Sequence, residues 1–145
     1  MPNLSLTQAL QILEAARREA ARLRARPLAY AVVDAGGHLL ALQRDERAGP
    51  LRAAIAQNKA WGVIALGVSS AELARQISGH TDWWIGISGT AGGRLVPSPG
   101  GLAILDGDGE VVGAIGISGE KSVVDEAIGA TAVRSVGLTI ADEAS

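Results

Sequence analysis

One glycine-rich stretch constrains the fold of this chain more than any other. It reads "GGLAILDGDGEVVGAIGIS" over residues 100–118, and seven of the chain's nineteen glycines lie within residues 100–127. Its apolar runs, joined at residues 107–109, predict two antiparallel strands with a tight turn between them. Glycine weakens a strand unless another part of the molecule needs the room that the missing side chain leaves. We therefore expect close packing against this hairpin.

Two kinds of neighbour are expected along the stretch. We predict that a helix or a neighbouring subunit packs on Gly113, Gly116 and Gly119. Gly100 and Gly101 are consecutive glycines, whose exposed peptide N–H groups can bind an anion or stabilise an oxyanion. We interpret them as the wall of a ligand pocket, with a loop shaped only by packing as the alternative.

The remaining segments predict alternating helices and hairpins. Ser5 and Gln8 form a potential capping box before an amphipathic repeat, and Gly36-Gly37 separates two β-prone runs. The predicted elements are a helix over 5–25, strands over 28–35 and 38–45, helices over 51–67 and 69–77, a strand at "WWIGIS" (83–88), the two glycine-rich strands, and a helix from Ser122 to about Ile140. Hairpins rather than βαβ crossovers indicate a single α+β domain over residues 1–145, with a profilin- or PAS-like antiparallel sheet covered by helices.

Composition excludes several classes of function. Thirteen basic and fifteen acidic residues give a formal net charge of -2, which disfavours nucleic acid as a partner. The absence of cysteine removes thiol nucleophiles and thiolate metal sites, and the two histidines lack metal-ligand spacing, so we predict no metal site. No basic and apolar leader and no apolar run long enough for a bilayer is present, so we expect a cytoplasmic protein without a membrane partner.

A few polar residues are candidates for chemistry. Asp34 flanks a two-glycine turn with His38, so the carboxylate can orient the imidazole as a general base; the alternative is a turn aspartate beside a solvent-facing histidine. Arg44 and Lys59 are candidates to hold a carboxylate, or else to form salt bridges with Asp45, Glu46 or Asp125. Glu120 is a candidate acid or base near the start of the last helix.

The chain has few aromatic residues, and two of its tryptophans lie close to a histidine in one segment. Trp83 and Trp84 follow His80 in a chain without phenylalanine. Stacking on a flat or cationic ligand and burial at a subunit contact are both open interpretations. We expect one concavity, which Trp83 or Trp84 of the same or a neighbouring chain completes. Its border consists of the catalytic candidates Asp34, His38 and Glu120 and the ligand-binding candidates Arg44, Lys59, Gly100 and Gly101.

Three motifs occur in one order: "AVVDAGGHLLALQRD", then "IAQNKA", then "PGGLAILDGDGEVVGAIGISG" followed by "DEA". Together they resemble the haem-binding GlcG/HbpS-like family, which includes the C-terminal domain of PduO-type proteins. The resemblance spans about residues 6–138. It implies a profilin-like fold, assembly into homo-oligomers, and haem or a corrinoid-related partner in some members.

Two functions follow as hypotheses. The first is binding of a small ligand, with haem as a candidate cofactor whose iron His38, His80, Tyr30 or a hydroxyl group would ligate. The second is a cofactor-free lyase, hydratase or isomerase acting on a small organic acid or carbonyl compound. In that case His38 or Glu120 moves the proton, and the cations with the glycine amides hold the anionic oxygen. The sequence contains neither a zinc motif nor a nucleotide-binding motif.

Overall fold

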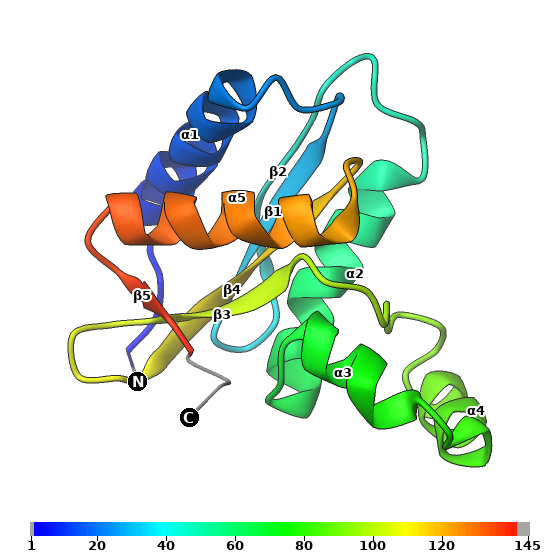
Figure 1. Cartoon of the computed structure of the whole chain (residues 1–145). Helices are drawn as coiled ribbons and strands as arrows, with labels where there is room; N and C mark the ends of the chain where they lie inside the picture. The colour runs from blue at the N-terminus through cyan, green and yellow to red at the C-terminus, as the bar shows by residue number, and fades with distance from the viewer. Residues whose placement is uncertain (1, 142–145) are drawn as a thin grey trace.

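The computed structural model describes residues 2–141, and within them one antiparallel sheet carries helices on both faces (Figure 1). The sheet order is β2-β1-β4-β3-β5. The helices are α1 (Leu6–Arg22), α2 (Arg52–Leu66), α3 (Ser70–Ile77), α4 (Thr81–Thr90) and α5 (Ser122–Ser135). The strands are β1 (Ala29–Asp34), β2 (Leu39–Arg44), β3 (Gly101–Leu105), β4 (Val111–Ser118) and β5 (Thr139–Ile140). The predicted α+β class, both hairpins and the antiparallel sheet are confirmed.

The sheet has a core on each face because the strands alternate their side chains. Tyr30 and Val32 of β1 pack with α1 and α5, whereas Val33 packs with Ala60 and Val63 of α2. Figure 1 shows α1 and α5 on one side of the sheet and α2 on the other. The predicted capping box starts α1, since Ser5 and Gln8 exchange backbone and side-chain hydrogen bonds.

The glycines of β4 and β3 allow α2 to lie unusually close to the sheet. A Cβ atom on Gly116 would collide with the carbonyl oxygen of Ala56, and one on Gly101 would lie 2.5 Å from that of Lys59. The predicted packing of a helix is therefore confirmed at Gly116, where the helix is α2 of the same chain. It is wrong at the other two positions, because an added Cβ would meet the carbonyl oxygen of Val33 in β1 at Gly113 and that of Pro27 at Gly119.

Two element predictions are wrong. Residues 83–88 lie in helix α4 rather than in a strand, and the last helix ends at Ser135 instead of Ile140. A helix satisfies its own backbone hydrogen-bonding groups, so this segment forms regular structure outside the sheet without a partner strand. Gly137, at φ +85°, reverses the chain after α5 and directs it into β5.

Candidate functional site

Asp34 and His38 form the turn between β1 and β2. Asp34 Oδ1 accepts hydrogen bonds from the backbone N–H groups of Gly36 (2.9 Å) and His38 (3.0 Å), and His38 Nδ1 lies 3.3 Å from the same oxygen. Burial alone raises the pKa of Asp34, but these amides and the imidazole lower it on balance below its usual value. The His38 side chain is 82% exposed, so the pair has the geometry of a turn aspartate beside a solvent-facing histidine.

Lys59 is buried in the interior, where its side chain is 3% exposed. Its Nζ donates to the carbonyl oxygen of Ile117 (2.8 Å) and to Asp125 Oδ2 (3.4 Å). Burial lowers the pKa of Lys59 and raises that of Asp125, while the two groups oppose these shifts through their mutual attraction. The pairing with Asp125 that the sequence allowed is therefore the one that forms.

Gly100 and Gly101 are buried against this lysine. The Gly101 amide donates to Ser70 Oγ (2.8 Å), and a Cβ atom on Gly100 would lie 2.8 Å from Lys59 Nζ. The surroundings of both residues match the packing interpretation, since protein atoms fill the space that a ligand was predicted to occupy.

Glu120 braces the loop between α1 and β1. Its Oε1 accepts from the backbone N–H of Arg26 (2.9 Å), and its Oε2 accepts from that of Lys121 (2.9 Å). These two amides lower the pKa of Glu120 below its usual value. The carboxylate thus joins the loop to the start of α5, where Asp125 Oδ1 in turn accepts from the Glu120 amide (3.0 Å).

Helix α4 carries the paired tryptophans. None of its residues is buried, and Trp83 and Ile85 are exposed. His80 lies at its N-terminal end, where Nδ1 contacts the carbonyl oxygen of Ser78 at 3.0 Å, beside an open cavity that also includes Trp83. The two tryptophans thus belong to an exposed helix at the periphery of the chain.

One chain does not bring all of the predicted site residues together. Ala29 at one end of β1 is paired with Ser118, close to Glu120, whereas His38 follows the other end of that strand. A six-residue strand spans roughly 20 Å, so His38 and Glu120 lie farther apart than a small substrate can bridge. His38 and Glu120 of one chain therefore do not border the same site.

A different concave region lies between the C-terminal half of α1 and the end of β2. It consists of two adjoining cavities of about 250 and 340 Å³ that share Arg17, Tyr30 and Asp45. We call this region the arginine groove. Its other lining residues are Ala20, Ala21, Arg24, Ala25, Arg26, Pro27, Leu28, Gln43, Arg44, Glu46 and Arg47.

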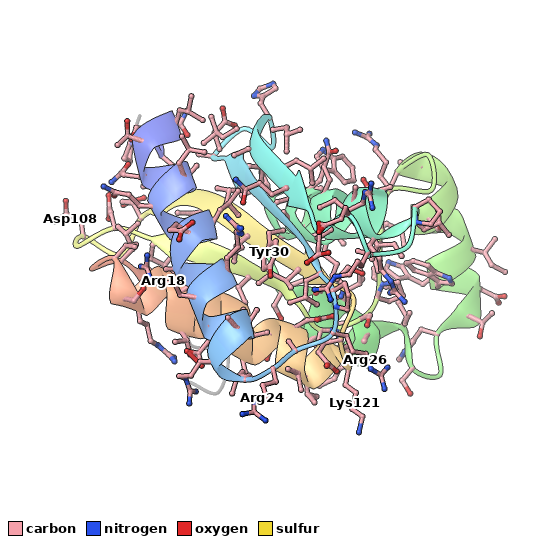
Figure 2. All side chains as sticks on the ribbon, turned by 90° about the horizontal axis from the view of Figure 1, so that it is seen from above. Arg18, Arg24, Arg26, Tyr30, Asp108 and Lys121 are labelled. Carbon is pink, nitrogen blue, oxygen red and sulfur yellow. The ribbon has the colours of Figure 1, made fainter. Side chains whose placement is uncertain are left out.

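Tyr30 is the one aromatic side chain among the residues that line the groove. It is 7% exposed, and it is labelled in Figure 2 among the side chains beside α1. Burial raises the pKa of the Tyr30 hydroxyl, and the positive charge of Arg17 opposes that rise. A phenol near several guanidinium groups can accept a hydrogen bond or bind a metal ion as phenolate.

The arginines of the groove differ in how they are held. Arg44 Nη1 donates to three backbone carbonyls, those of Asp45 (3.0 Å), Glu46 (3.3 Å) and Ala48 (2.8 Å). Arg44 therefore shapes the loop after β2 through carbonyl groups, and neither predicted carboxylate pairing is seen. Arg47 in turn bonds the carboxylate of Asp45.

Sequence reasoning missed most of this groove. Its signal is the run "RREAARLRAR", which places five arginines within residues 17–26. On a helix such a run normally marks a solvated face, and Arg17, Arg18 and Arg22 do pair there with glutamates. Arg24 and Arg26 lie beyond the end of α1, where the chain turns and brings their side chains toward the loop after β2.

The described part of the chain gives no sign of a metal cluster or of a membrane-spanning helix. Within residues 2–141, no three histidine, aspartate or glutamate side chains gather as a metal site. In the same range, no helix combines the length and apolar composition required to cross a membrane.

Known proteins resemble this chain over nearly its whole length. The chain is 28% identical over 130 residues to an uncharacterized 15.0 kDa protein from the dhaT–dhaS intergenic region of Citrobacter freundii, covering 90% of this chain and 89% of that protein. The crystal structure titled PduOC:Heme Complex superposes with a TM-score of 0.85 at 28% identity, covering 97% of this chain and 99% of that one. Klebsiella pneumoniae protein ORFY gives a TM-score of 0.84 at 26% identity, covering 92% of this chain and 90% of its own.

A family assignment rests on the sequence as well as the fold. Crystal structures of HbpS, at 24% identity and a TM-score of 0.80, share the fold. The sequence profile of the family described as "Haem degrading protein HbpS-like" matches residues 4–134. The chain therefore belongs to the HbpS-like family, as its motifs predicted.

Proposed function

We propose that this chain is a small-ligand-binding protein whose ligand is a haem-type macrocycle with negatively charged side groups, held in the arginine groove. The observation that carries the proposal is the position of Tyr30 and five arginines around one concave region. The relative whose structure is titled PduOC:Heme Complex supports haem as the ligand.

The donor set of the groove suits haem. A tyrosine hydroxyl is an established type of axial ligand to haem iron, and arginine binds carboxylates through a planar fork. Between these polar groups the wall consists of small or apolar side chains, namely Ala20, Ala21, Ala25, Pro27 and Leu28. When bound, haem supplies iron redox chemistry; the residues of this chain bind and orient it.

Tyr30 is better placed to bind iron than either histidine that the sequence offered. His38 is 82% exposed on a hairpin turn, and His80 borders an open cavity on the peripheral helix α4. Tyr30, in contrast, borders both cavities of the groove and has guanidinium groups around it. Nothing in the arrangement favours the acid–base enzyme, because its two proton-transfer candidates lie at opposite ends of β1.

Titration with haemin, followed by absorbance, tests the proposal. We expect saturable binding to the wild-type protein. Tyr30→Phe keeps the ring but removes the hydroxyl, so it should weaken binding at least tenfold, since loss of even an outer-shell partner costs about 10- to 100-fold in metal affinity. The phenolate-to-iron charge-transfer bands should disappear with it.

His38→Ala and His80→Ala are the matched controls, because each removes another candidate iron ligand outside the groove. Both variants should bind haemin as the wild type does. The proposal fails if the wild type binds no haemin, or if Tyr30→Phe leaves the spectrum unchanged while a histidine variant abolishes it.

Self-association and a cytoplasmic location belong to the same proposal. Helix α4 buries none of its residues although it contains two tryptophans and two isoleucines, which supports a contact with another copy of the chain. Such a contact would cover Trp83 and Ile85. The ligand site in the arginine groove does not depend on it.

A further inference from the structure

Arg24 occupies a backbone position at which a glycine is normally found. Helix α1 ends at a Schellman motif, in which the Arg24 amide donates to the carbonyl of Ala21 (3.1 Å) and the Ala25 amide to that of Ala20 (2.9 Å). This motif requires a left-handed residue after the helix, and Arg24 adopts φ +53°. A side chain with a Cβ atom is strained there, by an amount on the order of 1 kcal/mol.

The same chain supplies a direct comparison. Helix α5 ends in the same pair of hydrogen bonds, from Gly137 to Arg134 and from Leu138 to Val133, with glycine at the left-handed position. Among the described residues, every other residue with positive φ is also a glycine. The arginine at position 24 is therefore a departure from the pattern that this sequence follows elsewhere.

The left-handed conformation brings Arg24 to the arginine groove. Arg24 is among the residues that line the cavity bordered by Tyr30, and Figure 2 shows its side chain beyond the end of α1, at the edge of the molecule. The Glu120 carboxylate holds this segment by accepting from the Arg26 amide. The strained residue thus sits in a loop that is fixed from the other side.

The charges in the groove are unevenly neutralised. Arg17 pairs with Glu14 and Arg47 with Asp45. Over residues 2–141, no acidic side chain lies within salt-bridge distance of the Arg24 guanidinium group. Arg26 is closer to an acid, since its charge contributes to lowering the pKa of Glu120. A positive residue after a helix also interacts favourably with the helix dipole, but lysine or arginine in the last turn achieves that without backbone strain. The dipole alone does not explain this position.

We infer that Arg24 is a specificity-determining residue that binds an anionic group of the ligand, a carboxylate or a phosphate, with Arg26 as its neighbour. This inference rests on the proposed function, because it takes the arginine groove as the ligand site. Strained residues of this kind persist where the surrounding structure holds them and where they serve a ligand. If Arg24 lowers the stability of the fold but binds the ligand, replacing it should raise stability and weaken binding, and both effects can be measured.

Thermal unfolding of Arg24→Gly, without any ligand, tests the strain. Glycine relieves the left-handed conformation, so the variant should have a higher midpoint than Arg24→Ala, which keeps the strain and removes the charge. Equal midpoints for the two variants would overturn the argument from strain.

Anion binding is measured as the rise of the unfolding midpoint with sodium pyrophosphate or sodium succinate, against sodium chloride at equal ionic strength. The two probes separate a phosphate from a dicarboxylate ligand. The wild type should be stabilised by at least one of them, and Arg24→Gly and Arg24→Ala should bind that anion about tenfold more weakly, the usual effect of losing a charge-assisted hydrogen bond. Arg24→Lys should show an intermediate loss.

Arg18→Ala is the matched control, because it removes an arginine of the same helix that pairs with Glu14 and does not line the groove. It should respond to the anions as the wild type does. Equal responses of the wild type and Arg24→Ala, or no response of the wild type to either anion, would overturn the inference. If Tyr30→Phe abolishes haemin binding and Arg24→Ala leaves it unchanged, this inference alone is overturned. If the anions stabilise the protein through Arg24 but haemin does not bind, only the proposed function is overturned.

Discussion

Lys59 joins the two faces of the sheet through one buried ion pair. It extends from α2, past the end of β4, to Asp125 on α5, and both side chains are at most 3% exposed. Burying an ion pair costs desolvation energy, and here a backbone carbonyl and the Glu120 amide supply the additional hydrogen bonds that such a pair needs. At this residue, chemistry that looked suitable for a ligand instead serves the fold.

Removal of one partner of this pair should be severe. We expect Lys59→Met to lower the free energy of unfolding by about 3–5 kcal/mol, because it leaves the Asp125 carboxylate buried without its counter-charge. Urea denaturation measures the change. The double variant Lys59→Met, Asp125→Leu should recover much of the loss, and a single variant within about 1 kcal/mol of the wild type would contradict the account.

At the scale of elements, the sequence predicted the helix caps and turns that depend on neighbouring residues. The capping box of α1, the Ser69 cap of α3 and both hairpin turns are decided by residues a few positions apart. Helix α4 was not predictable in this way, since an apolar run with two tryptophans also suits a strand. The groove was missed because it needs α1, the turn at Arg24 and the loop after β2 together.

The close approach of α2 to β4 gives an element-scale prediction. Gly116→Ala should destabilise the protein by about 1–3 kcal/mol, because the added methyl group collides with the backbone of α2 at Ala56. Gly107→Ala is the matched control in the β3–β4 turn, where an added Cβ meets nothing within 4 Å. Equal stabilities of the two variants in denaturant would contradict this packing.

At the scale of the whole molecule, the charges are distributed unevenly despite a small net charge. Five arginines and two acidic residues line the arginine groove, and Figure 2 shows Arg24, Arg26 and Lys121 along one edge of the molecule. A net charge of -2 hides this local excess of arginine, so composition disfavoured nucleic acid but gave no sign of the groove. Whether haemin binds in the arginine groove therefore tests whether this HbpS-like chain has a haem-type ligand.

Self-association is the prediction for the assembled molecule. Light scattering at micromolar concentration should give a multiple of the 14.8 kDa chain mass, because α4 would otherwise leave its apolar side chains in water. The double variant Trp83→Ser, Ile85→Ser should have a smaller assembled mass. It should remain folded, since neither side chain is buried. A wild-type monomer would exclude this contact.

The central claim is that the arginine groove binds the ligand with Tyr30 at the iron. The most direct measurement is a crystal structure of the protein with haemin, in which anomalous scattering at the iron edge locates the metal. We predict one iron position within bonding distance of the Tyr30 hydroxyl, with the carboxylates of the macrocycle directed toward Arg24 and Arg26. An iron bound at His38 or His80, or an arginine groove without the macrocycle in crystals that hold it elsewhere, would contradict the account.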